Sequence, residues 1–264
     1  MILSLSTPAH SKPLRWDLIF YKAASSLQSE TSKSRLGVVW WVLDPIMYMA
    51  VFYVVFELVF ERGGPGFIVK LLVALVVWRW FDNSVKGCAN SLVTGIGLMR
   101  QVYVSKFLFP LAAFISQTIK FLVVVAILLG FLLMYGIELS FSWLGLLPVL
   151  LTQGVFIIGL GLCLSAIIPF IPDLKTVIDY IIQIGFFLSG VFYDISRIPD
   201  YLQPYFKLNP MATIIEQSRQ VLLFQQAPDW VALGWIVLVG CLLIGLGSYL
   251  LLRFDRDYPN LILP

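Results

Sequence analysis

A chain of 264 residues with 59% hydrophobic and only 12% charged residues has too little polar surface to cover a water-soluble globule of this size. The composition therefore predicts an integral membrane protein that is solvated by lipid. The net charge of +3 is explained by basic residues in cytosolic segments, so no nucleic-acid partner is expected. Cys88, Cys163 and Cys241 are scattered in or near apolar stretches, a pattern typical of small buried residues and not of a disulfide or metal set.

The first expected element is a short amphipathic helix over residues 14–30. Aromatic residues such as Trp16 and Phe20 lie between positions that favour water, among them Arg15 and Lys22. Such a helix can lie flat at the cytosolic headgroups, or it can be a cytosolic helix packed on a partner. Long apolar sequence begins only after this mostly polar stretch, so a cleaved signal peptide is not expected.

Six apolar stretches follow, and a helix needs about 20 residues to cross the hydrocarbon core. The second stretch is the least apolar because it contains Asp82, Asn83 and Lys86, and it reaches this length only as one helix through Asn90. If the N-terminus is cytosolic, the cytosolic segments contain more Lys and Arg than the outer segments do. Both termini are therefore predicted to lie in the cytosol. We expect a single all-α transmembrane domain, residues 1–264, with spans over residues 38–60, 67–90, 107–135, 143–168, 176–193 and 231–252.

A long outer segment, residues 194–229, separates the last two predicted spans. It is rich in apolar residues, but Pro199, Pro204, Pro210 and Pro228 break it. We therefore expect short re-entrant helices that dip back from the outer surface rather than a further span. Packing against lipid alone is the alternative.

The start of the first span carries a specific signature. The sequence from Leu36 to Pro45, LGVVWWVLDP, resembles the L-G-x-x-W-x-x-L-x-P pattern of permease subunits of ABC-2 type polysaccharide exporters. Residues 78–92, 100–110 and 198–219 are similar to the same family, in the same order. The resemblance implies a permease of the bacterial inner membrane that exports a lipid-linked polysaccharide, most of all O-antigen. Teichoic acid, capsule and a small lipid or drug are alternative cargoes within the family.

The resemblance also implies partners. Two copies of the chain would pair and bind two ATPase subunits, with membrane lipids around them. The chain contains no G-x-x-x-x-G-K-[ST] phosphate loop, so ATP and Mg²⁺ are expected on the separate ATPase subunit. This chain itself is expected to bind no cofactor or metal and not to be an enzyme.

Aromatic and polar residues of the first two spans are candidates for the lining of a polysaccharide conduit. Aromatic rings suit sugars because stacking tolerates changes of register, and polar residues at helical spacing would wet one wall. Interfacial anchoring of Trp41 and ion pairing of Asp82 within its own helix are the alternatives. For Glu57 and Lys120 the same two interpretations stay open, namely a polar group in the conduit or an ion pair within the bundle. The candidate conduit residues are Trp41, Tyr48, Phe52, Trp78, Arg79, Phe81, Asp82 and Lys86.

Residues 97–106 resemble the coupling helix of the family, which docks on the ATPase subunit. Arg100, Tyr103 and Lys106, three residues apart, would then present one face to the partner; a simple charged turn is the alternative. Asp173 lies beside two prolines that end the fourth span and marks a second, smaller contact. The resemblance further implies that the outer segment forms an exit gate, for which the candidates are Tyr201, Tyr205, Asn209, Glu216 and Arg219.

Two other classes of function would also suit an apolar multi-pass chain. A membrane-embedded transferase is disfavoured because the only histidine is His10, near the N-terminus, and no carboxylate pair occurs in a recognisable motif. A secondary transporter or channel predicts inverted repeats or helices broken at the bilayer midplane, and neither is evident. Copurification of an ATPase would separate this second class from the exporter.

Overall fold

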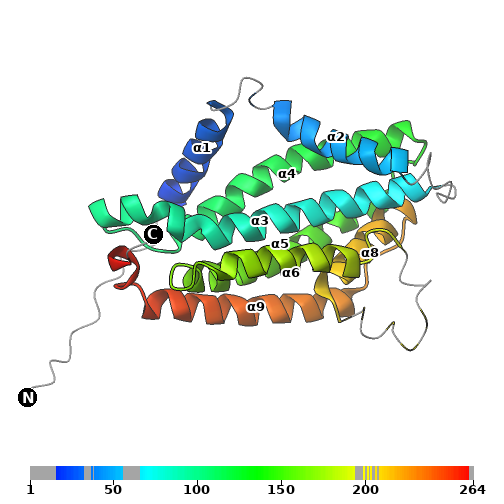
Figure 1. The fold of residues 1–264 in the computed structure, drawn as a ribbon. Coiled ribbons are helices and arrows are strands. Elements are labelled where there is room, and N and C mark those ends of the chain that lie inside the picture. Colours follow the sequence, from blue (N-terminus) through cyan, green and yellow to red (C-terminus); the bar gives the residue numbers. More distant parts are fainter. Residues whose placement is uncertain are drawn as a thin grey trace, which may run out of the picture.

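The computed structural model describes residues 16–32, 37, 39–55, 66–193, 199, 201, 203, 206 and 208–261. Regular structure in these residues is helical throughout, as the composition predicts. Helices α3, α4, α5, α6 and α9 run roughly along one direction, with α3 in the middle of the bundle (Figure 1). The helices are α1 Trp16–Ser32, α2 Val39–Tyr53, α3 Phe67–Gln101, α4 Leu108–Met134, η2 Phe141–Gly145, α5 Leu146–Ile167, α6 Leu174–Leu188, α8 Pro210–Leu223, α9 Trp230–Arg253 and η4 Tyr258–Asn260.

The central helix α3 has 35 residues, which is roughly 52 Å at 1.5 Å per residue. It follows Gly66, whose φ of +83° is a left-handed conformation that glycine adopts without strain. The prediction that this helix ends at Asn90 is wrong, because it continues to Gln101. No proline interrupts the added turns, and Leu92 and Met99 are buried in a second hydrophobic cluster that also includes residues of α4 and α9. The first half of the predicted coupling segment is therefore the last turn of α3.

Helices α5 and α9 pack at very short range. A Cβ atom on Gly159 would lie 2.7 Å from the carbonyl oxygen of Gly240, and one on Gly247 would lie 2.7 Å from the backbone nitrogen of Cys163. Only glycine fits such contacts, and small residues at helix crossings are typical of packing in membranes. This contact fixes α9 against the core of the bundle.

Three helical segments among the described residues are long and apolar enough to cross a membrane: Leu108–Met134, Phe141–Ile167 and Trp230–Arg253. Their many exposed large apolar side chains suit a lipid environment. Helices α2 and α6 have only 15 residues each, and α3 carries charges along its length. The structure supports a multi-pass membrane protein, and the number of six spans stays a prediction.

The predicted N-terminal helix is present as α1. It packs on α4 through Ile19 and Ala23, and the Ser116 hydroxyl donates a hydrogen bond to the Ala23 carbonyl at 3.2 Å. Trp16 and Phe20 remain exposed. Within residues 194–229 the structure contains one short helix, α8, and most of residues 194–207 lie outside the described residues. The re-entrant, outer position of this helix stays a prediction.

Candidate functional site

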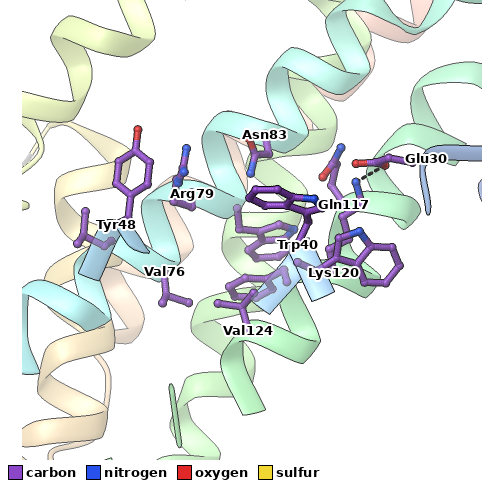
Figure 2. A pocket seen from close by; sticks show the side chains of 13 residues that line it. Glu30, Trp40, Tyr48, Val76, Arg79, Asn83, Gln117, Lys120 and Val124 are labelled. Carbon is purple, nitrogen blue, oxygen red and sulfur yellow. Dashed lines mark hydrogen bonds and ion pairs between the residues drawn. The ribbon is translucent and has the colours of Figure 1, made fainter. Parts of the chain in front are cut away.

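A cavity of about 370 Å³ lies where α1, α2, α3 and α4 meet. Figure 2 shows the side chains around it. Three of the predicted conduit residues, Trp41, Tyr48 and Arg79, are part of its lining. The full lining is Glu30, Trp40, Trp41, Tyr48, Leu75, Val76, Arg79, Trp80, Asn83, Gln117, Lys120, Phe121 and Val124.

On one side of the cavity, a cation–π contact joins α2 to α3. The guanidinium carbon of Arg79 lies 3.8 Å from the centre of the Tyr48 ring. A guanidinium stacked on an aromatic face at this distance is stabilised by the ring quadrupole and held in a fixed orientation. The contact places a positive charge at the cavity wall, beside the Tyr48 ring (Figure 2).

On the other side, Lys120 of α4 forms an ion pair with Glu30 of α1 (Figure 2). The Lys120 ammonium also lies 5.7 Å from the centre of the Trp41 ring. The Lys120 side chain is 16% exposed and that of Glu30 is 56% exposed. Lys120 therefore pairs within the chain, one of the two interpretations that the sequence left open, while Glu57 lies outside the described residues.

The wall between α3 and α4 is an aromatic stack. The rings of Trp80 and Phe121 are parallel within 5°, with centres 4.3 Å apart. The indole nitrogen of Trp80 donates a hydrogen bond to the Thr118 hydroxyl at 3.3 Å. Both rings are almost fully buried, so this wall is rigid.

Trp78 and Phe81 do not reach the cavity. Their side chains are 5% and 7% exposed and pack on Phe186 of α6 and Phe156 of α5. Within one copy of the chain their rings fill the core beside α3, and a role of these residues in a passage between two copies stays a prediction. The side chain of Phe52 lies outside the described residues.

Asp82 and Lys86 form an ion pair along α3. The Lys86 ammonium also lies 3.8 Å from a carboxylate oxygen of Asp179 on α6. For these two conduit candidates the structure favours the alternative interpretation, in which Asp82 forms an ion pair within its own helix. The contact between Lys86 and Asp179 also connects α3 to α6.

At the other end of α3, the predicted coupling residues contact the C-terminal segment after α9. Arg100 donates hydrogen bonds to the carbonyls of Pro259 and Leu261, at 3.2 and 2.8 Å. The Tyr103 hydroxyl donates to the Asp255 carboxylate at 3.0 Å. Burial, together with this hydrogen bond, raises the pKa of Tyr103 above its ordinary value.

Lys106 does not share an outward face with Arg100 and Tyr103, contrary to the sequence prediction. Its side chain is only 2% exposed, and its ammonium lies 3.5 Å from the other carboxylate oxygen of Asp255. The ammonium also donates to the Val104 carbonyl at 3.3 Å and lies 5.0 Å from the centre of the Tyr103 ring. A buried cation needs such partners, so Lys106 anchors the linker.

The C-terminal segment also reaches the turn between α5 and α6. The ring of Phe170 packs against Phe254 and Tyr258, at 5.1 and 5.3 Å between centres. The Tyr258 hydroxyl donates to the Ala166 carbonyl at 3.1 Å. Asp173, the second predicted contact, is exposed beside this turn. The two predicted ATPase contacts thus lie at one end of the bundle, where η4 lies beside the last turns of α3 (Figure 1). Residues 254–261 contact both of them.

No sequence pattern described above predicts a role for residues 254–261. Their signal was present in Asp255 and Asp257, acidic residues next to Arg253 and Arg256 directly after the last apolar span. Positive-inside counting uses only the cations, and so it passes over the Asp255 carboxylate, which binds both Lys106 and Tyr103.

Two of the predicted gate residues hold α8 in place. Arg219 is 2% exposed and donates hydrogen bonds to the carbonyls of Lys70, Gly190, Val191 and Tyr193, at 2.9 to 3.3 Å. This binding ties α8 to the start of α3 and the end of α6, so the Arg219 side chain lies inside the fold and not at an opening.

Asn209 begins α8. Its side-chain oxygen accepts from the backbone nitrogens of Met211 and Ala212, and its amide donates to the Ser189 hydroxyl at 3.0 Å. An asparagine at the N-cap accepts hydrogen bonds from backbone N–H groups of the first turn, which have no partner within the helix. Tyr201 is exposed and Glu216 is partly buried, whereas Tyr205 lies outside the described residues.

Within the described residues, no group of three or more His, Cys, Asp or Glu side chains is placed to hold a metal ion. The polar chemistry of the site thus comes from two cations, one carboxylate, two amides and indole rings at the cavity.

Comparison with known proteins places the chain in a family. A model of the family described as ABC-2 type transporter matches residues 20–223. The chain is 24% identical to an O-antigen export system permease protein RfbA of Klebsiella pneumoniae, over 78% of this chain and 80% of that protein. It is 25% identical to an RfbA of Myxococcus xanthus over 77% and 79%, and 23% identical to the polysialic acid transport protein KpsM of Escherichia coli over 84% and 88%. This polypeptide, a multi-pass helical membrane protein, belongs to the ABC-2 type transporter family.

Proposed function

We propose that the chain is the permease subunit of an ATP-driven exporter of a lipid-linked polysaccharide, with O-antigen as the first candidate cargo. The observation that carries the proposal is the similarity to three proteins whose names state export or transport of a polysaccharide, over about four fifths of both chains. The relative named for polysialic acid makes a capsule-type polysaccharide the second candidate.

In this proposal six helices cross the bacterial inner membrane: α2, α3, α4, α5, α6 and α9. The basic residues of the end that holds Arg100, Lys106 and Arg253 support a cytosolic position for that end. The remaining short helices would lie at the two membrane surfaces.

We further propose that two copies pair around the polymer and that each copy binds one ATPase subunit. The described cavity, about 370 Å³, has the size of a site for one small ligand and not of a passage for a polymer. A wider passage is more naturally formed between two copies. Exposed apolar side chains of α6, such as Tyr180 and Ile184, offer surface for such pairing.

The cytosolic end would receive the mechanical input from the ATPase. Because Lys106 and Tyr103 bind Asp255, and Phe170 packs on Tyr258, the α3–α4 linker and the α5–α6 turn are joined through the C-terminal segment. A push at either contact would therefore move α3, α5 and α9 together, as a rigid-body input.

A gene deletion tests the cargo class. In a strain that lacks the chain, the lipid-linked glycan should accumulate on the cytosolic side and disappear from the cell surface, and the wild-type gene should restore surface glycan. A surface glycan that is unchanged in the deletion strain would contradict polysaccharide export.

Reconstitution tests the division of labour. In proteoliposomes the chain alone should neither hydrolyse ATP nor move a glycan, and addition of its ATPase subunit should produce both activities. Glycan transport by the chain alone would contradict an ATP-driven mechanism.

A further inference from the structure

The cavity among α1, α2, α3 and α4 contains two side-chain amides, those of Asn83 on α3 and Gln117 on α4. Within the part of the chain that the structure describes, neither amide forms a hydrogen bond with another protein group. Figure 2 shows both of them between Arg79 and Glu30. An amide has one acceptor oxygen and two N–H donors, so the cavity holds hydrogen-bonding capacity that the protein itself leaves unused.

Gln117 lies well inside a helix that is long and apolar enough to cross a membrane. It follows Leu108, the first residue of α4, by nine positions, which is roughly 14 Å along the helix. Hydrocarbon cannot satisfy an amide at such a depth, and polar side chains there face the interior of a bundle or a wet cavity. The two amides therefore favour a cavity content that carries hydroxyl groups.

The charged residues of the cavity already have partners. The Arg79 guanidinium stacks on the Tyr48 ring at 3.8 Å, and Lys120 forms an ion pair with Glu30. A charged ligand would have to break one of these contacts or bring an uncompensated charge into the site, which is costly away from bulk water. An uncharged ligand leaves both contacts in place.

The rest of the lining is mostly aromatic and apolar. Trp40 is 44% exposed, and Trp41 and Trp80 line the same cavity. An apolar lining with a few polar groups is typical of a site for a small ligand, and about 370 Å³ is enough for one small molecule. A sugar ring has an apolar face that stacks on an indole and hydroxyls that donate and accept hydrogen bonds, so it matches both parts of this lining.

We propose that the cavity binds one uncharged sugar ring, with the Trp40 indole against its apolar face and the Asn83 and Gln117 amides on its hydroxyls. Asn83 and Trp40 are exposed, so the cavity opens at the surface and a second sugar can extend from it. This inference rests on the proposed function and assigns to it a binding site for one sugar unit of the cargo.

The sizes of the expected effects follow from the contacts. Loss of one hydrogen bond between neutral groups weakens binding about fivefold. Loss of an aromatic platform weakens it about tenfold. If Gln117 and Trp40 served only the packing of the helices, their replacement would change the unfolding temperature and leave sugar binding as it is in the folded protein.

The experiment measures binding to the full-length permease in nanodiscs of phosphatidylcholine, by saturation-transfer NMR titration with empty nanodiscs as the blank. The first probes are the methyl glycosides of N-acetylglucosamine, mannose and galactose. The second set contains disaccharides and 1-phosphates of the same sugars. Cyclohexanol, an apolar ring with a single hydroxyl, tests whether the cavity merely accepts any ring of this size.

The variants change one contact each: Trp40→Ala, Trp40→Tyr and Gln117→Leu. Their matched controls lie outside the cavity. Trp235→Ala removes a tryptophan of similar exposure, 49%, on α9, and Gln183→Leu removes an exposed glutamine on α6.

We expect at least one methyl glycoside to bind. Trp40→Ala should weaken this binding about tenfold and Gln117→Leu about fivefold, whereas Trp40→Tyr should retain much of it because an aromatic face remains. Trp235→Ala and Gln183→Leu should leave it unchanged. A disaccharide should bind at least as tightly as its methyl glycoside, the 1-phosphate no more tightly, and cyclohexanol much more weakly.

Several results would overturn the inference. These are no binding of any glycoside to protein that thermal unfolding shows to be folded, equal binding of cyclohexanol, tighter binding of the 1-phosphate, and equal effects of the cavity variants and their controls. Exclusion of every disaccharide would show that the ligand is a free monosaccharide and would overturn the assignment to the cargo.

Failure of this site and failure of the proposed function give different results. If no sugar binds while surface glycan still depends on the chain in the deletion strain, the site is wrong and the exporter stands. If sugars bind while surface glycan is unchanged in the deletion strain, the proposed function fails, and with it the assignment of the site to the cargo.

Discussion

The Lys106 ammonium lies 3.5 Å from a carboxylate oxygen of Asp255. These residues are far apart in the sequence, one directly before α4 and the other directly after α9. The Tyr103 hydroxyl binds the second oxygen of the same carboxylate at 3.0 Å. One acidic side chain thus holds the α3–α4 linker on the C-terminal segment, and its removal should loosen both.

Replacement of Asp255 by Asn should leave the Lys106 cation buried without its counter-charge. We expect the linker to lose stability on the order of 2 kcal/mol, visible as faster hydrogen exchange at the amides of residues 102–106. The double variant Lys106→Met with Asp255→Leu removes both charges and should restore much of the protection. Unchanged exchange in Asp255→Asn would show that the ion pair does not hold the linker.

The Tyr103 phenol should titrate above its ordinary pKa of 10.0, because burial and the Asp255 carboxylate favour the neutral form. Its contribution to stability is thus present below pH 10 and is lost as the pH rises through the raised value. The measurement is the alkaline absorbance of the protein minus that of Tyr103→Phe. Asp255→Asn should lower the midpoint of this difference, and a midpoint at or below 10 in the wild type would refute the prediction.

Arg219→Lys should destabilise the protein despite keeping the charge. One ammonium cannot reproduce the planar set of donors that reaches the carbonyls of Lys70, Gly190, Val191 and Tyr193. We expect a loss of about 2–3 kcal/mol from buried carbonyls left without donors, measured as a lower unfolding temperature in detergent. Arg253→Lys, at the exposed end of α9, is the matched control and should change little.

Gly247→Ala should weaken the packing of α9 on α5, since the added Cβ would lie 2.7 Å from the Cys163 nitrogen. Overpacking of this kind costs about 1–3 kcal/mol. Gly245→Ala, two residues away, has open space around the new methyl group and should be neutral or slightly stabilising, because alanine favours the helix. Equal unfolding temperatures for the two variants would contradict the close contact.

Asp173→Arg tests the proposed ATPase contact and leaves the contacts of Asp255 with Tyr103 and Lys106 in place, because Asp173 is exposed at the start of α6. A charge reversal at a docking surface should reduce copurification of the ATPase subunit about tenfold or more, and export with it, while the protein remains in the membrane. Asp17→Arg, which is also exposed but lies on α1, is the control. Export at the wild-type level in Asp173→Arg would remove this residue from the docking surface.

The sequence was sufficient for the class and for most helices. Composition and the lengths of the apolar runs predict an all-helical membrane protein, and the predicted ranges 107–135 and 231–252 differ by one residue at each end from α4 and α9. These features are local, because a run of apolar residues forms a helix wherever lipid surrounds it. The same local patterns predicted the helix at residues 14–30, which is α1, and a short helix before the last span, which is α8.

The tertiary structure decided the roles of single side chains. Their aromatic rings made Trp78 and Phe81 conduit candidates, and a spacing of three residues placed Lys106 on an outward face. In the structure the two rings pack against Phe186 and Phe156 and are buried, and Lys106 pairs with Asp255 and is buried as well. The spacing of residues along one helix does not predict which of its faces another helix covers. It also does not predict which carboxylate, far away in the sequence, pairs with a given cation. Those choices depend on contacts between residues far apart in the chain, and they made Trp41, Tyr48, Arg79 and Lys120 the walls of one cavity.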